Sequence, residues 1–504
     1  MVNDSVILDA YEKWGDDCVK HLFGDFAFAI WDDRKQRYFC ARDHFGVKPF
    51  YYTYIDNEFA FSSSLNELRL NPRVSNTLNE IAVGDYLLFG VNQDLSTTIF
   101  KDIHRLPPGH TLTVANGSIK IQRYWSPEPS TELRFRDPRA YVERFSELLA
   151  QAVRDRVTTE RVGISMSGGL DSTSLAAIAH KQNKDVHAFA VVYDSLIPDE
   201  ERHYSTLVAE HLGIPITHLS ADRYELFDGE LDQPEPFLIS ALGGQFKDLL
   251  RASADFSPVM LTGYDGDAFM NVPQPSRLGA VKRRIKRLIN EKRAATEGRP
   301  YSSFDKSFSW LEESFARRTD LFERWKRPSI DPASPDNPMW TALFEGYDSS
   351  STKLNLEVRH PFIDVRLVEF LSSIPVRPWR VKKHILREAM KGQLPAAVLN
   401  RRKTPLGGDP ALQLVRRGSV RCVESFEVSP QLRAFVNLNR RRSLADEETS
   451  DGLWANLRIF ALNYWLTNSQ PAVRRTSQPT GNVNRGNEDL NCPNRMKMEI
   501  MHGT

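Results

Sequence analysis

Residues 163–180, GISMSGGLDSTSLAAIAH, combine residue types that bind phosphate groups. An apolar run leads into Gly168-Gly169, which hydroxyl and acidic side chains and then a helical pattern follow. A glycine-rich turn between a strand and a helix places backbone N–H groups and a helix N-terminus around a small concavity, which binds anions. Glycine allows close approach of a ligand, and Ser167 and Ser172 supply hydroxyl donors. The stretch therefore predicts a phosphate-binding loop.

The acidic residue of this loop, Asp171, indicates that a cation takes part. A carboxylate beside a polyphosphate would repel it unless a divalent ion lay between them, so we expect Asp171 to bind Mg²⁺. The lysine of the GxxxxGK[ST] loop is absent, which argues against γ-phosphate transfer. The alternative is a glycine-rich turn without a ligand, but a plain helix start needs only one capping side chain.

Alternating strands and helices must position this loop. Apolar strand patterns at 162–167 and 186–194 alternate with an amphipathic helical pattern at 140–157 and a second helical pattern at 173–182. This order predicts an α/β domain over residues 139–470, with a parallel sheet flanked by helices. Ligands bind such sheets beyond the carboxyl ends of the strands, where the glycine loop falls.

The N-terminal part has a different residue pattern. The segments FAFAIWD, RYFCARD, PFYYTYID and EFAFSSS are short, aromatic or alternating, and turn residues separate them. Residues 1–125 are therefore predicted to form an α+β domain with mostly antiparallel strands. The proline-containing residues 126–138 are expected to be a linker, and the polar residues 471–504 a disordered tail.

Composition excludes several classes of partner. The chain has 66 basic and 65 acidic residues, so no overall charge favours nucleic acid or an anionic membrane. No apolar run reaches the roughly 18 residues of a membrane helix, and a cytoplasmic location is the default expectation. The four cysteines lack metal-ligand spacing, so no zinc site is expected.

The chain resembles the asparagine synthetase-related family. SGGLDS is the motif of PP-loop ATP pyrophosphatases, and LTGYDGDAF, LEVRHPFID and KKHILREAM are similar to further motifs of the family's synthetase domain. Residues 23–52 are similar to the latter part of its glutaminase domain, a class II glutamine amidotransferase-like domain. The resemblance extends over roughly residues 4–465 and implies a partial Ntn-hydrolase-like β-sandwich followed by a PP-loop domain.

The resemblance also implies a reaction. In the family, the loop holds the pyrophosphate of ATP while a carboxylate attacks the α-phosphorus, and an amine converts the acyl-adenylate to an amide. Mg²⁺ is the implied cofactor, with Asp171 and Asp267 as its ligands, and Lys403 matches a lysine near the α-phosphate. The implied ATP- and pyrophosphate-binding residues are Ser165, Ser167, Gly168, Gly169, Leu170, Asp171, Ser172 and Gly263.

Tyr264 matches a tyrosine of the β-lactam-forming synthetases in this superfamily. In those enzymes the tyrosine pairs with a glutamate and deprotonates an attacking amine. Glu345 is the candidate partner here, so Lys403, Tyr264 and Glu345 form the predicted catalytic set. A packed Tyr264 and a surface Glu345 are the alternative.

The sequence departs from the glutamine-dependent members of the family. Those members carry a nucleophilic cysteine after the initiator Met, whereas residue 2 is Val here. The glutamine-binding elements of the family are also absent. A domain kept as scaffold and a chain shortened at its start are two explanations, and the apolar sheet edges that would be exposed favour the second.

The sequence therefore predicts a carbon–nitrogen ligase that activates a carboxylate as its adenylate. Asparagine formation with ammonia or glutamine nitrogen is the first hypothesis, and a lasso-peptide or β-lactam-type cyclase is the second. A non-catalytic ATP-binding protein is the alternative of another class. The expected substrate is a small-molecule or peptide carboxylate, with no nucleic acid or membrane partner. The sequence leaves open whether the protein forms a homodimer or binds partner proteins of a biosynthetic cluster.

Overall fold

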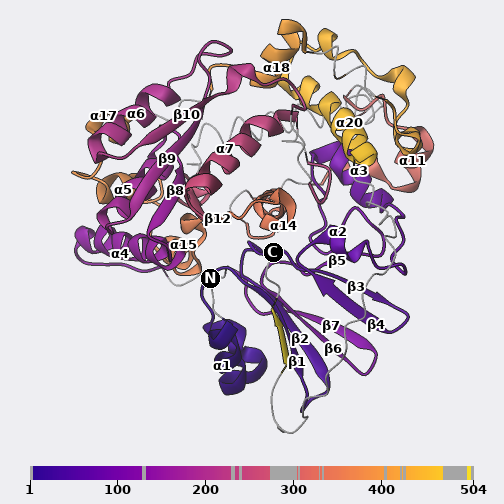
Figure 1. Cartoon of the computed structure of the whole chain (residues 1–504), viewed down its shortest axis with the longest axis horizontal. Coiled ribbons are helices and arrows are strands. Elements are labelled where there is room, and N and C mark those ends of the chain that lie inside the picture. Colours follow the sequence, from indigo (N-terminus) through magenta and orange to yellow (C-terminus); the bar gives the residue numbers. More distant parts are fainter. Residues whose placement is uncertain are drawn as a thin grey trace, which may run out of the picture.

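The computed structural model has two parts (Figure 1). A mostly antiparallel β domain forms the N-terminal part, and a parallel sheet with flanking helices forms the core of the second part. The fold class predicted from the sequence is therefore confirmed. The structure describes residues 4–127, 132–228, 233–237, 241–272, 304, 307–327, 330–331, 334–401, 406–419, 423, 427–468 and 497–500.

Two antiparallel sheets build the N-terminal domain. The first has the order β13-β1-β2-β6-β7 and the second the order β4-β3-β5. Their strands are β1 (Ala27–Asp32), β2 (Arg37–Arg42), β3 (Tyr51–Ile55), β4 (Glu58–Ser62), β5 (His104–Arg105), β6 (His110–Ala115), β7 (Ser118–Arg123) and β13 (Lys497–Ile500). Helices α1 (Asp4–Trp14), η1 (Gly15–His21), α2 (Leu65–Leu68) and α3 (Glu80–Phe89) complete the domain.

Strand β1 is buried on both faces, and its side chains alternate accordingly. Phe28 and Ile30 pack in one cluster with Tyr11 of α1. Ala29 packs in another cluster with Tyr52 of the second sheet. Large residues therefore face the helix and small residues face the aromatic second sheet, which fixes the pairing register.

The parallel sheet has the order β10-β9-β8-β11-β12. Its strands are β8 (Arg161–Ser165), β9 (Asp185–Val192), β10 (Ile216–Ser220), β11 (Val259–Thr262) and β12 (Glu357–Arg359). Strands β9 and β10 follow β8 along the chain and lie on one side of it in the sheet. The chain then crosses to the other side of β8 to form β11. The order therefore reverses between β8 and β11, and open α/β sheets bind ligands at such a switch point.

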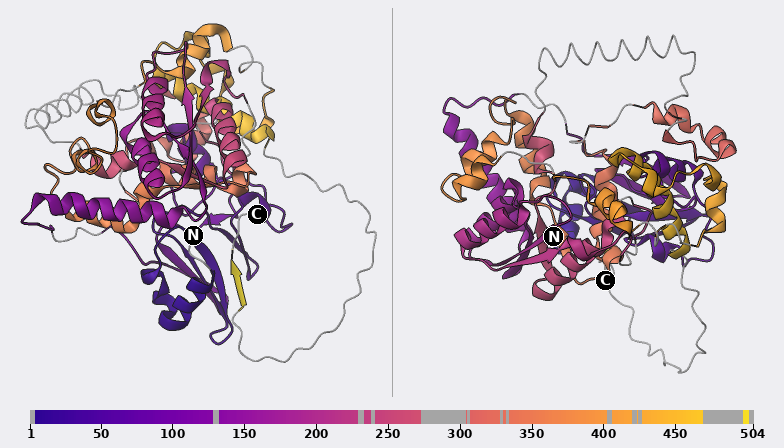
Figure 2. Two further views of the ribbon diagram at one scale, coloured as in Figure 1. Left: turned by 60° about the vertical axis from the view of Figure 1, so that its left-hand side comes forward. Right: turned by 90° about the horizontal axis from the view of Figure 1, so that it is seen from above.

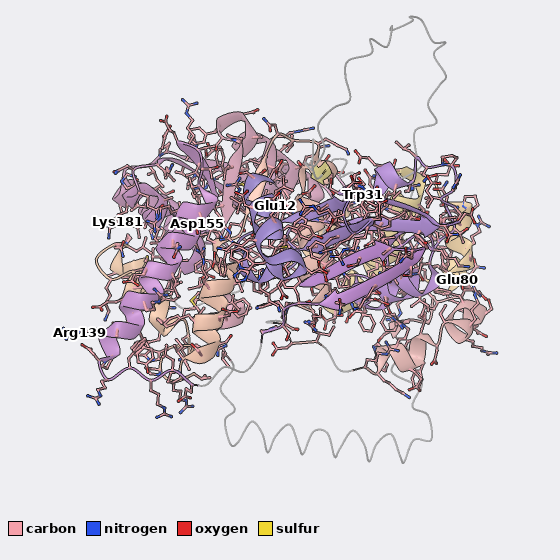
Figure 3. All side chains as sticks on the ribbon, turned by 90° about the horizontal axis from the view of Figure 1, so that it is seen from below. Glu12, Trp31, Glu80, Arg139, Asp155 and Lys181 are labelled. Carbon is pink, nitrogen blue, oxygen red and sulfur yellow. The ribbon has the colours of Figure 1, made fainter. Side chains whose placement is uncertain are left out.

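Helices cover this sheet. They are α4 (Pro138–Arg156), α5 (Leu170–Lys181), α6 (Glu201–Leu212) and α7 (Gly243–Phe256). Asp137 caps α4, because its carboxylate accepts a hydrogen bond from the N–H of Arg139 at 2.9 Å. Figure 3 shows Arg139 and Asp155 toward the two ends of α4, with Trp31 on the N-terminal sheet.

Further helices among the described residues complete the second part. The helices that follow α7 are α8 (Gly266–Met270), α11 (Glu313–Arg318), α12 (Leu321–Trp325), α13 (Pro338–Tyr347), α14 (Ser349–Thr352), α15 (Val365–Ser373), α16 (His384–Ala389), α17 (Ala396–Asn400), α18 (Pro410–Leu414) and α20 (Ser450–Asn468). Helix α20 packs with α3 of the N-terminal domain in one shared apolar cluster, which includes Leu87 and Leu457. No helix in the described ranges is long and apolar enough to cross a membrane.

Strand β13 differs from the prediction of a disordered tail at residues 471–504. It pairs antiparallel with β1, with Ile500 opposite Phe28 and Lys497 opposite Trp31. Figure 2 shows this strand, in yellow, beside the N-terminal sheet. The edge of β1 offers backbone N–H and C=O groups to an extended segment, and this backbone pairing is not visible in residue composition. The rest of the predicted tail lies outside the described residues.

Candidate functional site

Two glycine-containing loops meet at the switch point of the parallel sheet. One follows β8 and the other follows β11, and Ser165 lies opposite Thr262 where these strands end. A Cβ atom on Gly263 would lie 2.6 Å from the backbone N of Ser172, at the start of α5. Only glycine permits this approach, so the second loop packs directly against the first.

Internal hydrogen bonds hold the first loop. The Oγ atoms of Ser167 and Ser172 lie 3.2 Å apart, and the Ser172 hydroxyl also donates to the carbonyl of Ser167 at 3.0 Å. The N–H of Gly169 donates to Oγ of Ser167 at 3.3 Å. Leu170 is the buried first residue of α5. The loop is thereby preformed at a helix N-terminus, where it fits an anion.

Two carboxylates converge on one lysine beside this loop. Nζ of Lys383 lies 2.5 Å from Oδ2 of Asp171 and 2.9 Å from Oδ1 of Asp267. The structure therefore brings together the two predicted Mg²⁺ ligands, which lie 96 positions apart in the sequence. Sequence reasoning did not assign Lys383, although it lies in the KKHILREAM motif. The residues next to Lys383 in the sequence did not indicate its role, because its partners Asp171 and Asp267 belong to the distant helices α5 and α8.

A third carboxylate, Asp265, adds to the negative charge. Burial, and then the charges of Asp267 and Asp171, raise the pKa of Asp265 to about 7. Asp265 adopts a left-handed conformation with φ of 58° at the start of α8. A Cβ on Gly266 would lie 2.8 Å from the carboxylate carbon of Asp171, so a larger residue at this position would displace that carboxylate.

The carboxylates fit a divalent cation bound together with phosphate. Asp171 and Asp267 already surround one positive charge, the ammonium of Lys383. Among the described residues, no group of three or more His, Cys, Asp or Glu is arranged to hold a metal alone. Mg²⁺ commonly takes one or two protein carboxylates and completes its shell with phosphate and water. Two carboxylates are thus a suitable donor set for Mg²⁺ that also binds phosphate.

A second basic residue, Arg401, lies over the loop. A Cβ on Gly168 would lie 2.9 Å from Nη1 of Arg401, so the guanidinium is directly above the glycine. Arg401 immediately follows α17, and its carbonyl accepts a hydrogen bond from Arg387 at 3.1 Å. The predicted α-phosphate lysine, Lys403, lies outside the described residues.

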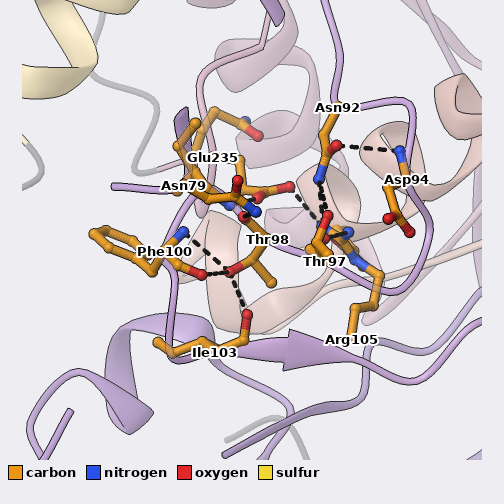
Figure 4. Close-up of polar contacts among 12 residues, drawn as sticks. Asn79, Asn92, Asp94, Thr97, Thr98, Phe100, Ile103, Arg105 and Glu235 are labelled. Atoms are coloured by element: carbon orange, nitrogen blue, oxygen red, sulfur yellow. Dashed lines mark hydrogen bonds and ion pairs between the residues drawn. The ribbon is translucent and has the colours of Figure 1, made fainter. Parts of the chain in front are cut away.

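The structure places Glu345 at the interface of the two domains. Its carboxylate accepts hydrogen bonds from Arg105 at 2.6 and 2.9 Å and from Arg42 at 3.2 Å. Arg105 also pairs with Glu235 at 2.5 Å, and Figure 4 shows the polar contacts around these two residues. Although burial acts to raise it, the pKa of Glu345 is held below its usual value, first by Arg105 and then by Arg42.

This geometry changes the interpretation of the Tyr264–Glu345 pair. Both oxygens of Glu345 are engaged by arginines from the N-terminal domain, so the carboxylate is a poor acceptor for a tyrosine proton. Tyr264 instead lies edge-on to His360 and Phe344, at ring-centroid distances of 6.3 and 6.4 Å. Burial raises the pKa of Tyr264 above its usual value, which further disfavours a phenolate base.

Comparisons with known proteins agree with this architecture. A glutamine amidotransferase domain model matches residues 3–125, and an asparagine synthase model matches residues 144–467. Glutamine-hydrolyzing asparagine synthetase 3 of Bacillus subtilis is 29% identical over 447 residues, which cover 79% of this chain and 70% of that protein. Asparagine synthetase 2 of the same organism is 28% identical and covers 79% of this chain, but the match spans only 58% of its own length. Amidase chry2 of Gibberella zeae is 24% identical, with 79% of this chain and 71% of that protein covered.

Proposed function

The chain belongs to the asparagine synthase family, and from that premise we propose that it forms amide bonds in an ATP-dependent reaction. A carboxylate substrate would be converted to its adenylate with release of pyrophosphate, and an amine would then displace AMP. One observation supports the proposal: where the loops after β8 and β11 meet, Nζ of Lys383 lies 2.5 Å from Asp171 and 2.9 Å from Asp267.

The loop residues would bind the pyrophosphate part of ATP. Backbone N–H groups at the start of α5 and the hydroxyl of Ser167 are donors at a helix N-terminus, where the helix dipole favours negative charge. Asp171 and Asp267 would hold Mg²⁺, which neutralises phosphate oxygens when it is bound. Lys383 would supply a fixed ammonium once a metal takes over part of its pairing with the carboxylates.

The proposal has two candidates for the carboxylate and the amine. Free aspartate with ammonia is the first candidate, because two relatives carry the name asparagine synthetase. A peptide or specialised metabolite that forms an intramolecular amide is the second candidate. The nucleotide chemistry is the same in both.

The test is pyrophosphate release by the purified chain from ATP and Mg²⁺. One reaction contains aspartate and ammonium, and a second contains no added substrate. Release that depends on aspartate, with asparagine as product, would support the first candidate. ATP binding without a response to aspartate would favour a different carboxylate. Failure to bind ATP at all would overturn the proposed function.

A further inference from the structure

The phosphate-binding loop is occupied by an anion of the protein itself. The N–H of Gly168 donates a hydrogen bond to the carboxylate of Glu201, the first residue of α6. Gly168 belongs to the loop that the proposed function assigns to pyrophosphate. A carboxylate and a phosphate oxygen accept the same hydrogen bond, so they compete for one donor.

The same carboxylate holds Arg401. Nη2 of Arg401 lies 3.3 Å from Oε1 of Glu201, and the guanidinium stacks at 4.1 Å from the ring centroid of Tyr204. The arginine side chain is only 10% exposed. Its buried Nε has no hydrogen-bond partner among the described residues. Arg401 therefore lies against the loop with donor capacity that Glu201 does not use.

Glu201 can leave the loop without unfolding its helix. Its backbone N–H is bound separately, to the carboxylate of Asp199 at 2.9 Å. The side chain is 20% exposed, so water is close to the carboxylate in its present position. Rotation about the side-chain bonds is therefore enough to release Gly168 and Arg401 together.

We propose that Glu201 is an internal counter-anion that occupies the phosphate loop until nucleotide displaces it. Arg401 then pairs with the bound phosphates instead of Glu201. This inference rests on the proposed function. Glu201 is a positioning residue that sets the affinity for phosphate ligands, and Arg401 is a binding residue. Glu201 contacts the loop where phosphate would bind, and the ammonium of Lys383 lies between Asp171 and Asp267 where the metal would bind.

The experiment measures binding of ATP, inorganic pyrophosphate and adenosine to the full chain in the presence of Mg²⁺, by titration calorimetry. Glu201→Gln keeps the size of the side chain and removes its charge. ATP and pyrophosphate should bind about five- to tenfold more tightly to this variant, because one charge-assisted hydrogen bond of the ligand-free state is weakened. Adenosine has no phosphate, and its affinity should not change. Arg401→Gln should weaken pyrophosphate binding by about tenfold or more.

Glu200→Gln is the matched control. Glu200 is the preceding residue, carries the same charge and lies 3.9 Å from Nη2 of Arg401, but it is 60% exposed. Its removal changes the local charge equally and leaves the contact of Glu201 with Gly168 in place. Less than a twofold change in pyrophosphate affinity is expected for this variant, because an exposed pair at this distance is screened by solvent.

The direction of the change separates this role from a merely structural one. If Glu201 only braces the loop and Arg401, Glu201→Gln will weaken pyrophosphate binding, and the inference is overturned. If Glu201→Gln and Glu200→Gln bind pyrophosphate more tightly by the same factor, the inference is also overturned, because loss of any nearby negative charge would then explain the effect. Absence of ATP binding in the parent chain would instead remove the proposed function itself. A thermal melt of each variant confirms that it is folded.

Discussion

The buried ion cluster at the domain interface allows a quantitative prediction for Glu345→Gln. Arg42 and Arg105 belong to the N-terminal domain, and their side chains are 0% and 3% exposed beside a carboxylate that is 2% exposed. The substitution keeps the shape of the side chain and removes its charge. Removal of one partner from a buried pair costs about 3–5 kcal/mol, because the remaining charge stays out of water.

The lower end of this range applies because Glu235 remains beside Arg105. We therefore expect a loss of about 3 kcal/mol in the free energy of unfolding. For a chain of 504 residues, about 2.1 cal/mol/K per residue gives an unfolding entropy of about 1 kcal/mol/K. The Tm should then fall by about 3 °C if the chain unfolds as one unit, and by more if the N-terminal domain unfolds separately.

Glu80→Gln is the control in a thermal melt of both variants. Glu80 of α3 accepts hydrogen bonds from Arg318 of α11 at 2.6 and 2.9 Å, but these side chains are 42% and 41% exposed. An exposed pair of this kind contributes about 0–1 kcal/mol, so the Tm of the control should change by less than about 1 °C. An equal change in the two variants would refute the assignment of Glu345 to a buried structural cluster.

At low pH the difference in Tm between the parent chain and Glu345→Gln should disappear. The pKa of Glu345 is depressed in the folded state, so its contribution is present above the unfolded carboxyl pKa and is lost as the pH falls through the folded value. Pyrophosphate release provides a second readout, at a temperature where both proteins are folded. Lost release with an unchanged Tm would return Glu345 to the catalytic role predicted with Tyr264.

Three further substitutions test the nucleotide site. Asp171→Asn should lower pyrophosphate release by at least about 100-fold, because the neutral amide binds Mg²⁺ poorly; release at the parent rate would exclude Asp171 as a metal ligand. Lys403→Ala should slow release by about 100-fold with a modest loss of ATP affinity, and turnover equal to that of the parent would remove its predicted role at the α-phosphate. Gly263→Ala would place a Cβ 2.6 Å from the backbone N of Ser172, so it should weaken ATP binding and destabilise the fold by about 1–3 kcal/mol, as calorimetry and thermal melts would show.

Local features of the site were predictable from the sequence. Residues 163–180 encode a strand, a glycine turn and a helix start through short-range preferences, and the structure forms β8, the loop and α5 at these positions. The alternation of strands and helices also predicted a parallel sheet. Its ligand-binding edge follows from the direction of the strands, which βαβ connections make parallel.

Contacts between distant segments were not predictable in the same way. Glu345 looked like a base for Tyr264, because both lie near motifs of the family, but Arg105 binds it across 240 positions of the sequence. Lys383, Glu201 and Arg401 carried no assignment, although each contacts the loop or its aspartate. Strand β13 was likewise not predicted, because it lies in the mostly polar segment 471–504.

The sequence by itself determined the glycine loop with Asp171 and the order of strands and helices, because glycine conformation, capping and hydrophobic periodicity act within a few residues. Asp267 was predicted only from the resemblance of LTGYDGDAF to a family motif. Only the tertiary structure decided which charges meet: Lys383 between Asp171 and Asp267, Glu201 on the loop, and Glu345 between the arginines of the other domain. The energy of a charge depends on its burial and on partners within a few ångströms, and both are set by packing of segments that are far apart in the chain.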